Sequence, residues 1–279
     1  MLEYEIVDVF TGRAYTGNPL AVVFGAGELT PSGMQAIAAE FNLSETAFVV
    51  PTTSPEADYR VRIFTPKAEL PYAGHPSIGT AVTLARRGEV EEGELVQECG
   101  AGLLAVTVSG AFATLTGASA TIADPIDPAP YLAACGLGAD DLAGRLRVAG
   151  TGLEFPYLPV TEDALDRAHP ITDDSVDEVY LFTWDAEKAT ARARLFDPAK
   201  GIVEDPATGS AALGLGVYLV AEGWAAPDGD TSYLIEQGTH IDRPSHLECV
   251  VSASEGVVER VTVRGQVLPI ARGELVALP

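Results

Sequence analysis

Pro71-Tyr72-Ala73-Gly74-His75-Pro76-Ser77-Ile78-Gly79-Thr80-Ala81 has the pattern of a glycine loop that opens an apolar helix, and this stretch is the most informative about the architecture. The other half of the chain contains a second stretch of this kind: Glu204-Asp205-Pro206-Ala207-Thr208-Gly209-Ser210-Ala211-Ala212-Leu213-Gly214. Each stretch follows a strand-like run that ends in a Phe-x-Pro corner, Phe64-Thr65-Pro66 in one and Phe196-Asp197-Pro198 in the other. This repetition predicts two copies of one strand–loop–helix unit that face each other.

The start of a helix is a favourable place for an anion. Its first N–H groups have no partner within the helix, and the positive end of the helix dipole lies there. We therefore expect the helices that begin near Gly74 and Gly209 to point at a shared cleft and to bind a carboxylate.

Composition limits the classes of protein that this chain can be. Its 279 residues and 47% apolar content suit two packed halves. A net charge of −23, from 40 acidic and 17 basic residues, argues against nucleic acid and anionic membranes as partners. The first residues lack the pattern of a signal peptide, and no apolar run approaches the ~20 residues of a membrane span. Three widely spaced cysteines indicate a reducing compartment, so we expect a cytoplasmic protein.

Periodicity predicts an α+β fold of two pseudo-symmetric halves. Thr30 and Pro31 cap a helix that ends near Asn42, and the two glycine loops begin helices that end near Arg87 and Glu222. The other segments are mostly strands, so each half is expected to curl a mostly antiparallel sheet around one buried helix. The predicted strands lie at residues 4–10, 20–24, 46–50, 57–64, 103–108, 112–115, 157–160, 179–184, 191–196, 231–235, 246–251, 258–263 and 267–270.

Several motifs together resemble the PhzF-like isomerase family, the phenazine-biosynthesis isomerases and their relatives, along the whole chain. In the late loop that runs from Gln237 to Ser245, Ile241-Asp242 stands where a Met-Gly pair is usual. The motifs that carry the resemblance are Val7-Asp8-Val9-Phe10, Gly17-Asn18-Pro19-Leu20-Ala21-Val22, Asn42-Leu43-Ser44-Glu45-Thr46-Ala47-Phe48-Val49, Phe64-Thr65-Pro66-Lys67-Ala68-Glu69-Leu70-Pro71-Tyr72-Ala73-Gly74-His75-Pro76 and Glu204-Asp205-Pro206-Ala207-Thr208-Gly209-Ser210-Ala211.

The resemblance implies a diaminopimelate-epimerase-like fold with an active site in the cleft between its halves. The expected halves are residues 1–122, joined by a C-terminal strand at about 268–279, and residues 123–267. The family match also implies a cofactor-independent isomerase that moves a proton on a small carboxylate, and a homodimer as a candidate assembly. Isomerisation of a dihydro-hydroxyanthranilate type of substrate is one candidate reaction.

The family's catalytic glutamate matches Glu45. This residue follows a loop and precedes an apolar strand, where burial favours the uptake of a proton by a carboxylate. A base near the C–H bond, which later returns the proton, is what a proton shift on carbon requires. The alternative for Glu45 is an exposed loop acid.

Asp205, His75 and Ser210 match further polar site residues of the family, with Asp205 and His75 as catalytic groups and Ser210 as a substrate contact. At the start of a helix His75 is expected to be a neutral imidazole, because a cation is disfavoured there. The structural alternative for all three side chains is an ordinary helix cap.

Gly74, Gly209 and Asn18 are expected to contact the substrate. The two glycines allow the backbone to approach a ligand closely, although glycine also serves any tight turn. Asn18 lies in a Gly-Asn-Pro turn, and a role in the turn alone is the alternative.

Other chemistries fit less well. Diaminopimelate epimerases carry a catalytic cysteine in each glycine loop, whereas Cys99, Cys135 and Cys249 lie elsewhere in this sequence, so racemisation by two thiols is disfavoured. A metal site at His240, His246 and Cys249 lacks a fourth ligand. Two alternatives remain open: an epimerase that uses Glu45 and Asp205 as opposed acid and base, and a non-catalytic protein that binds small carboxylates.

Overall fold

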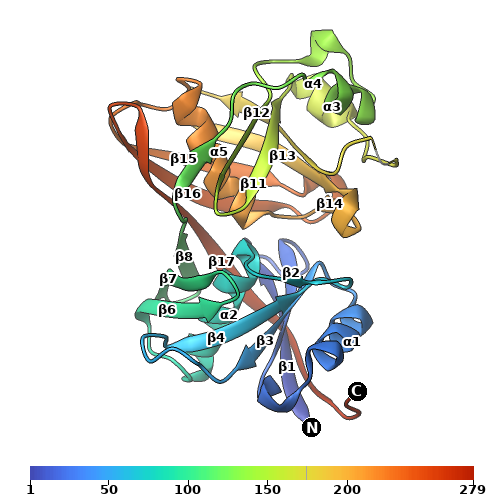
Figure 1. Ribbon diagram of the computed structural model, residues 1–279, viewed down its shortest axis with the longest axis vertical. Helices are drawn as coiled ribbons and strands as arrows, with labels where there is room; N and C mark the ends of the chain where they lie inside the picture. Colours follow the sequence, from blue (N-terminus) through green and yellow to red (C-terminus); the bar gives the residue numbers. More distant parts are fainter. Residues whose placement is uncertain (174) are drawn as a thin grey trace. The chain divides into compact units, whose positions relative to one another are not determined.

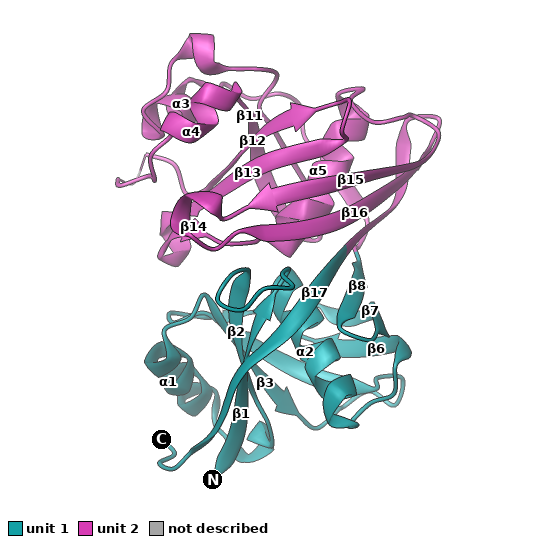
Figure 2. Cartoon of the chain, turned by 180° about the vertical axis from the view of Figure 1, so that it is seen from behind, with its two compact units in different colours: residues 1–116, 264–279 teal, residues 117–263 magenta. Residues whose placement is uncertain are grey.

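The computed structural model describes residues 1–173 and 175–279. The chain forms two compact units, coloured separately in Figure 2. Unit 1 contains Met1–Thr116 and Arg264–Pro279, and unit 2 contains Gly117–Val263. The protein is of the mixed α/β class, with helices and strands in both units (Figure 1).

Unit 1 contains eight strands of its own, two α-helices, a short 3-10 helix at Ala26–Glu28 and part of a long final strand. They are β1 (Leu2–Val9), β2 (Asn18–Val23), α1 (Pro31–Phe41), β3 (Glu45–Val50), β4 (Tyr59–Phe64), β5 (Glu69–Leu70), α2 (Gly74–Arg87), β6 (Gly93–Cys99), β7 (Gly102–Ser109), β8 (Phe112–Thr116) and β17 (Val257–Leu275).

The described residues of unit 2 form eight further strands and three α-helices, and the unit also includes the first residues of β17. They are β9 (Ala120–Ile122), α3 (Ala129–Ala134), β10 (Arg147–Thr151), β11 (Glu154–Pro159), α4 (Glu162–Arg167), β12 (Val179–Asp185), β13 (Thr190–Asp197), β14 (Ile202–Asp205), α5 (Gly209–Ala221), β15 (Gly229–Gln237) and β16 (Ser245–Ser254). Short 3-10 helices lie at Ala139–Asp141, Pro198–Lys200 and Thr239–Ile241.

The strands of the two units pair in the same order. In unit 1, β1 pairs with β2 antiparallel, β2 with β3 parallel, β3 with β4 and β4 with β5 antiparallel, β4 with β6 parallel, and β6 with β7 antiparallel. In unit 2, β10 to β16 repeat this series of directions step by step. Each glycine loop therefore occupies the same place in its unit, after a short strand and before the apolar helix.

The sheet of unit 1 closes on itself. Strand β17 pairs antiparallel with β1 and also pairs with β8, which in turn pairs with β7. Helix α2 packs against β1, β2, β3, β4, β7 and β8, and its residues 74–84 are all buried. A helix that is buried along most of its length needs such surroundings. The closed sheet thus fixes the position of the first glycine loop.

In unit 2, helix α5 packs against β9, β10, β11 and β16. Gly214 lets this helix approach Tyr157, because a Cβ at Gly214 would lie 2.3 Å from the Tyr157 hydroxyl oxygen. That hydroxyl donates a hydrogen bond of 2.7 Å to the carbonyl of Ala211. The glycine therefore allows a buried tyrosine to bind the start of the helix.

The predicted gap between the last two strands is wrong. The sequence pattern predicts separate strands at 258–263 and 267–270, but β17 runs without interruption through Gly265. A Cβ at Gly265 would lie 2.3 Å from the ring of Phe10, so this glycine serves close packing of an aromatic ring and not a turn. The amide of Phe10 also donates to the carbonyl of Gln266 at 2.8 Å.

Candidate active site

The first glycine loop places His75 inside unit 1. Helix α2 begins at Gly74, so His75 is its second residue, and the side chain is only 3% exposed. The residue at the N-cap is Ala73, and no side chain caps this helix. His75 is therefore not the helix cap that the sequence left as an alternative.

Glu45 is the first residue of β3 and faces His75. Its Oε2 atom lies 3.4 Å from Nε2 of His75, and the residue is 8% exposed. Strand β3 pairs with β2 on one side and β4 on the other, so the backbone that carries Glu45 is held within the sheet. The carboxylate is buried beside an imidazole and is not an exposed loop acid.

Asn18 and Ser44 orient the imidazole. The Ser44 hydroxyl donates to Oδ1 of Asn18 at 2.9 Å, which leaves the amide nitrogen of Asn18 directed at Nδ1 of His75, 3.2 Å away. An amide nitrogen can only donate, so Nδ1 accepts, and the proton of a neutral imidazole lies on Nε2. That N–H faces the carboxylate of Glu45.

Burial keeps the imidazole neutral. Removal of His75 from water disfavours its charged form and lowers its pKa to about 3. The contact with Glu45 at neutral pH is therefore that of a neutral imidazole with a carboxyl group, and it is not an ion pair. The first cluster, Asn18–Ser44–Glu45–His75, joins three segments that are far apart in the sequence.

A second polar cluster surrounds Asp205 in unit 2. Asp205 ends β14 and is 5% exposed, and its Oδ2 accepts a hydrogen bond of 2.5 Å from the Thr208 hydroxyl. The side-chain nitrogen of Gln237 donates to the Thr208 hydroxyl at 3.0 Å and to the Asp205 carbonyl at 2.9 Å. Its carbonyl oxygen accepts from the Thr208 amide and from the Tyr180 hydroxyl. Gln237 thus binds both Asp205 and Thr208 and holds the second glycine loop in place.

Gly209 and Ser210 follow this loop as the first two residues of α5. The N-cap residue is Thr208, and no side chain forms a cap hydrogen bond with this helix. Ser210 is buried, with 7% of its surface exposed. Asp205 and Ser210 are therefore not helix caps in the usual sense.

Ser44, Thr208 and Gln237 were not identified as site residues from the sequence. Ser44 adjoins Glu45 and Thr208 lies in the second glycine loop, so both belong to the motifs that carry the family resemblance. Gln237 is distant in sequence from the loop it supports, and only the pairing of β15 with β13 brings it there. The available signal was its place at the start of the late loop from Gln237 to Ser245.

The thiols are buried and poorly ionised. Cys99, Cys135 and Cys249 are all buried, and burial raises the pKa of Cys135 to about 12 and shifts the pKa of Cys249 further upward. Neither glycine loop contains a cysteine. Catalysis by two thiolates therefore has no support in this chain.

Within residues 1–173 and 175–279, no group of three or more His, Cys, Asp or Glu side chains is placed to hold a metal ion. His240 contacts Asp166 at 3.1 Å, while Cys249 is buried and its thiol approaches the carbonyl of Leu247 at 3.8 Å. None of the helices in the described part of the chain has the length and apolar character needed to cross a bilayer.

Comparison with known proteins places the chain in a family. The model of the phenazine biosynthesis-like protein family matches residues 7–273. An uncharacterized isomerase of Mesorhizobium japonicum is 35% identical over 98% of both chains. A trans-2,3-dihydro-3-hydroxyanthranilate isomerase of Pseudomonas fluorescens is 32% identical over 99% of this chain and 100% of the relative.

Solved structures agree with this assignment. The PhzF-family phenazine biosynthesis protein of Bacillus anthracis has a TM-score of 0.88 at 25% identity, with 99% of both chains covered. A probable proline racemase of Agrobacterium radiobacter has a TM-score of 0.69 at 15% identity over 99% of this chain and 93% of that one, and so shares the fold. This chain therefore belongs to the phenazine biosynthesis-like family of isomerases.

Proposed function

We propose that this isomerase moves a proton between two carbons of a small carboxylate substrate, with Glu45 as the proton carrier. The observation that supports this proposal most directly is the buried Glu45 carboxyl, 3.4 Å from an imidazole that burial keeps neutral. A carboxylate in such surroundings has little competition from water for a substrate proton.

The proposed reaction balances without a cofactor. The Glu45 carboxylate takes a proton from one carbon, and the electron pair of the broken C–H bond becomes delocalised as a double bond shifts. The protonated Glu45 then returns the proton to another carbon. With its proton on Nε2, the neutral His75 brings the positive end of an N–H dipole near the Glu45 carboxylate, 3.4 Å away, and so stabilises the charged form of Glu45 before the proton is taken.

The substrate class rests on the relatives. The Pseudomonas fluorescens relative is named for trans-2,3-dihydro-3-hydroxyanthranilate, a cyclic unsaturated carboxylate, and we propose a substrate of that class for this chain. Gly74 and Asn18 in unit 1, and Gly209 and Ser210 in unit 2, are proposed substrate contacts. Helix N-termini with buried surroundings favour a carboxylate.

We further propose that Asp205 is a second catalytic group, held ready by Thr208 and Gln237. The division into two pseudo-symmetric halves of the diaminopimelate-epimerase type, with boundaries at 122/123 and near 268, is part of the same proposal. A cytoplasmic homodimer is proposed from the family resemblance.

Proton exchange tests the proposal. The protein is incubated in heavy water with trans-2,3-dihydro-3-hydroxyanthranilate, and the product is analysed by NMR for deuterium and for the position of its double bonds. We expect a shifted double bond with the wild type and none with Glu45→Gln, while Glu40→Gln, an exposed matched control, stays active. Inversion of a stereocentre without a double-bond shift would instead identify an epimerase, and binding without exchange a carboxylate-binding protein.

A further inference from the structure

Unit 2 contains a cavity of about 550 Å³ that shares no residue with either polar cluster. It lies where the parallel strands β11 and β12 end: Pro159 is paired with Phe182, and beyond them the chain leaves β11 and enters α4. Crevices at the carboxyl ends of parallel strands are frequent ligand sites, and this volume is within the range of small-molecule pockets.

Aromatic residues contribute to the cavity wall. Trp184 and Trp224 line it and are partly exposed, whereas Phe182, also a lining residue, is fully buried. The ring centres of Phe182 and Trp224 are 5.9 Å apart. Trp224 also packs edge-on against Tyr218 at 5.7 Å, and its amide donates to the carbonyl of Leu219. The indole of Trp224 is therefore fixed in place by the packing beneath it.

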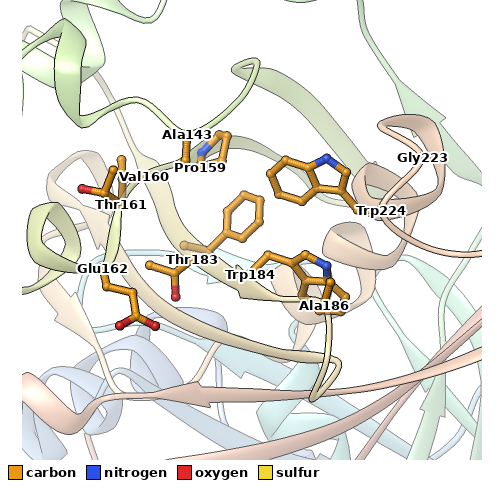
Figure 3. A pocket seen from close by; sticks show the side chains of 11 residues that line it. Ala143, Pro159, Val160, Thr161, Glu162, Thr183, Trp184, Ala186, Gly223 and Trp224 are labelled. Atoms are coloured by element: carbon orange, nitrogen blue, oxygen red, sulfur yellow. The ribbon is translucent and has the colours of Figure 1, made fainter.

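The charge on the residues that line the cavity is negative. Among the described residues that line the cavity, Glu162 is the only ionisable one, and the others are aromatic, aliphatic, glycine and threonine residues. Figure 3 shows Glu162 across the pocket from Trp184 and Trp224. The chain as a whole carries a net charge of −23, which further disfavours an anion.

We propose that this cavity binds a small organic cation, an ammonium group on an apolar body. Indole faces attract ammonium groups through their quadrupole, and a carboxylate across the pocket adds a direct attraction. The apolar remainder of the cavity suits the hydrocarbon part of such a ligand. This site is separate from the proposed proton transfer and does not depend on it.

The tryptophans themselves provide the measurement. The chain contains two tryptophans, and both line this cavity, so the intrinsic tryptophan emission reports this site alone. The wild-type protein is titrated with choline at constant ionic strength, and in parallel with 3,3-dimethylbutan-1-ol, its neutral isostere, and with benzoate. We expect a saturable change with choline that is about tenfold tighter than with the alcohol, and none with benzoate.

Two variants test whether Glu162 and Trp224 account for the binding of choline. Glu162→Gln is expected to weaken choline binding about three- to tenfold without affecting the alcohol, while Glu259→Gln, an exposed acid outside the cavity, leaves both unchanged. Trp224→Leu is expected to weaken choline binding about tenfold, with the remaining Trp184 as reporter. Circular dichroism checks that each variant is folded; if Trp224→Leu is not, the Glu162→Gln comparison decides.

Three results would overturn the proposal. They are the absence of a saturable signal at millimolar choline, equal affinity for choline and its neutral isostere, and tighter binding of benzoate than of choline. Isothermal titration calorimetry on the wild type gives an independent value of the same affinity.

Discussion

The side-chain nitrogen of Asn18 lies 3.2 Å from Nδ1 of His75, although the two residues are 57 positions apart in the sequence. The oxygen of this amide accepts from the Ser44 hydroxyl and its nitrogen is directed at Nδ1, so the imidazole proton is assigned to Nε2. A turn residue thus sets the tautomer of a buried histidine, and through it the donor that faces Glu45.

Asn18→Asp should reverse this assignment. An aspartate accepts where the amide donates, so it favours a proton on Nδ1, or on both nitrogens, and raises the pKa of His75. We expect kcat to fall about 10²-fold, as typical for loss of a correctly placed proton donor. The pH dependence of kcat should also gain an ionisation that the wild type lacks. Ser44→Ala, which frees the amide to rotate, is expected to lower kcat less, and an unchanged pH profile in Asn18→Asp contradicts the tautomer assignment.

His75 should make stability depend on pH. The folded-state pKa is about 3, below the ordinary value of 6.5, so between these limits the unfolded chain binds more protons than the folded one. The contribution of His75 to folding is then complete above about pH 6.5 and is lost as the pH falls toward 3, with a slope of up to about 1.4 kcal/mol per pH unit.

Urea unfolding of the wild type and of His75→Gln, measured from pH 7 to pH 4, checks this dependence. The free energy of unfolding of the wild type should fall more steeply with acidification than that of the variant. Parallel curves for the two proteins would show that His75 is protonated normally in the folded state.

Gln237→Leu should destabilise unit 2 and lower activity together. The substitution leaves the Asp205 carbonyl and the Thr208 amide and hydroxyl without this partner, and each buried polar group that loses its partner costs roughly 1–3 kcal/mol. Chemical denaturation should show a loss of about 2–4 kcal/mol. Gln35→Leu, which removes one side-chain bond to the Thr65 carbonyl, is the matched control with an expected loss of about 1 kcal/mol. Equal losses in the two variants would contradict a special role of Gln237.

Gly214→Ala should destabilise the protein although alanine is the better helix former. The new Cβ would lie 2.3 Å from the Tyr157 hydroxyl oxygen, and relief of this overlap is expected to cost about 1–3 kcal/mol. Tyr157→Phe should recover part of the loss in a double-mutant cycle. Gly33→Ala in α1 meets its nearest atom at 3.4 Å and should change the melting temperature little, which separates packing from helix propensity.

Local signals in the sequence located helices α1 and α2, whereas the short helix α4 (Glu162–Arg167) was not predicted. Helix α1 is confirmed with Thr30 as its N-cap, whose hydroxyl accepts from the Gly33 amide at 3.1 Å, and with Asn42 at its end. Helix α2 is confirmed to Arg87 with Gly88 after it. These ends depend on caps, proline and glycine, which are properties of a few adjacent residues.

Non-local contacts were harder to read. Strand β6 was not predicted, since its polar residues, among them the buried Gln97, offset the apolar pattern. The uninterrupted β17 depends on Phe10, and the support of Asp205 depends on Gln237; both lie far away in the sequence. The neutral state of His75 was expected from its place at a helix start, but burial is the cause that the structure assigns. The proposed roles of the site residues stay predictions.

The closed sheet of unit 1 has a consequence for protein synthesis. The strand that completes it, β17, is translated after all other strands of that unit, whereas unit 2 is one uninterrupted segment of chain. On the ribosome, β1 and β8 must wait with exposed edges while residues 117–263 are made. We therefore expect unit 2 to complete its folding before unit 1, although the synthesis of unit 1 begins first.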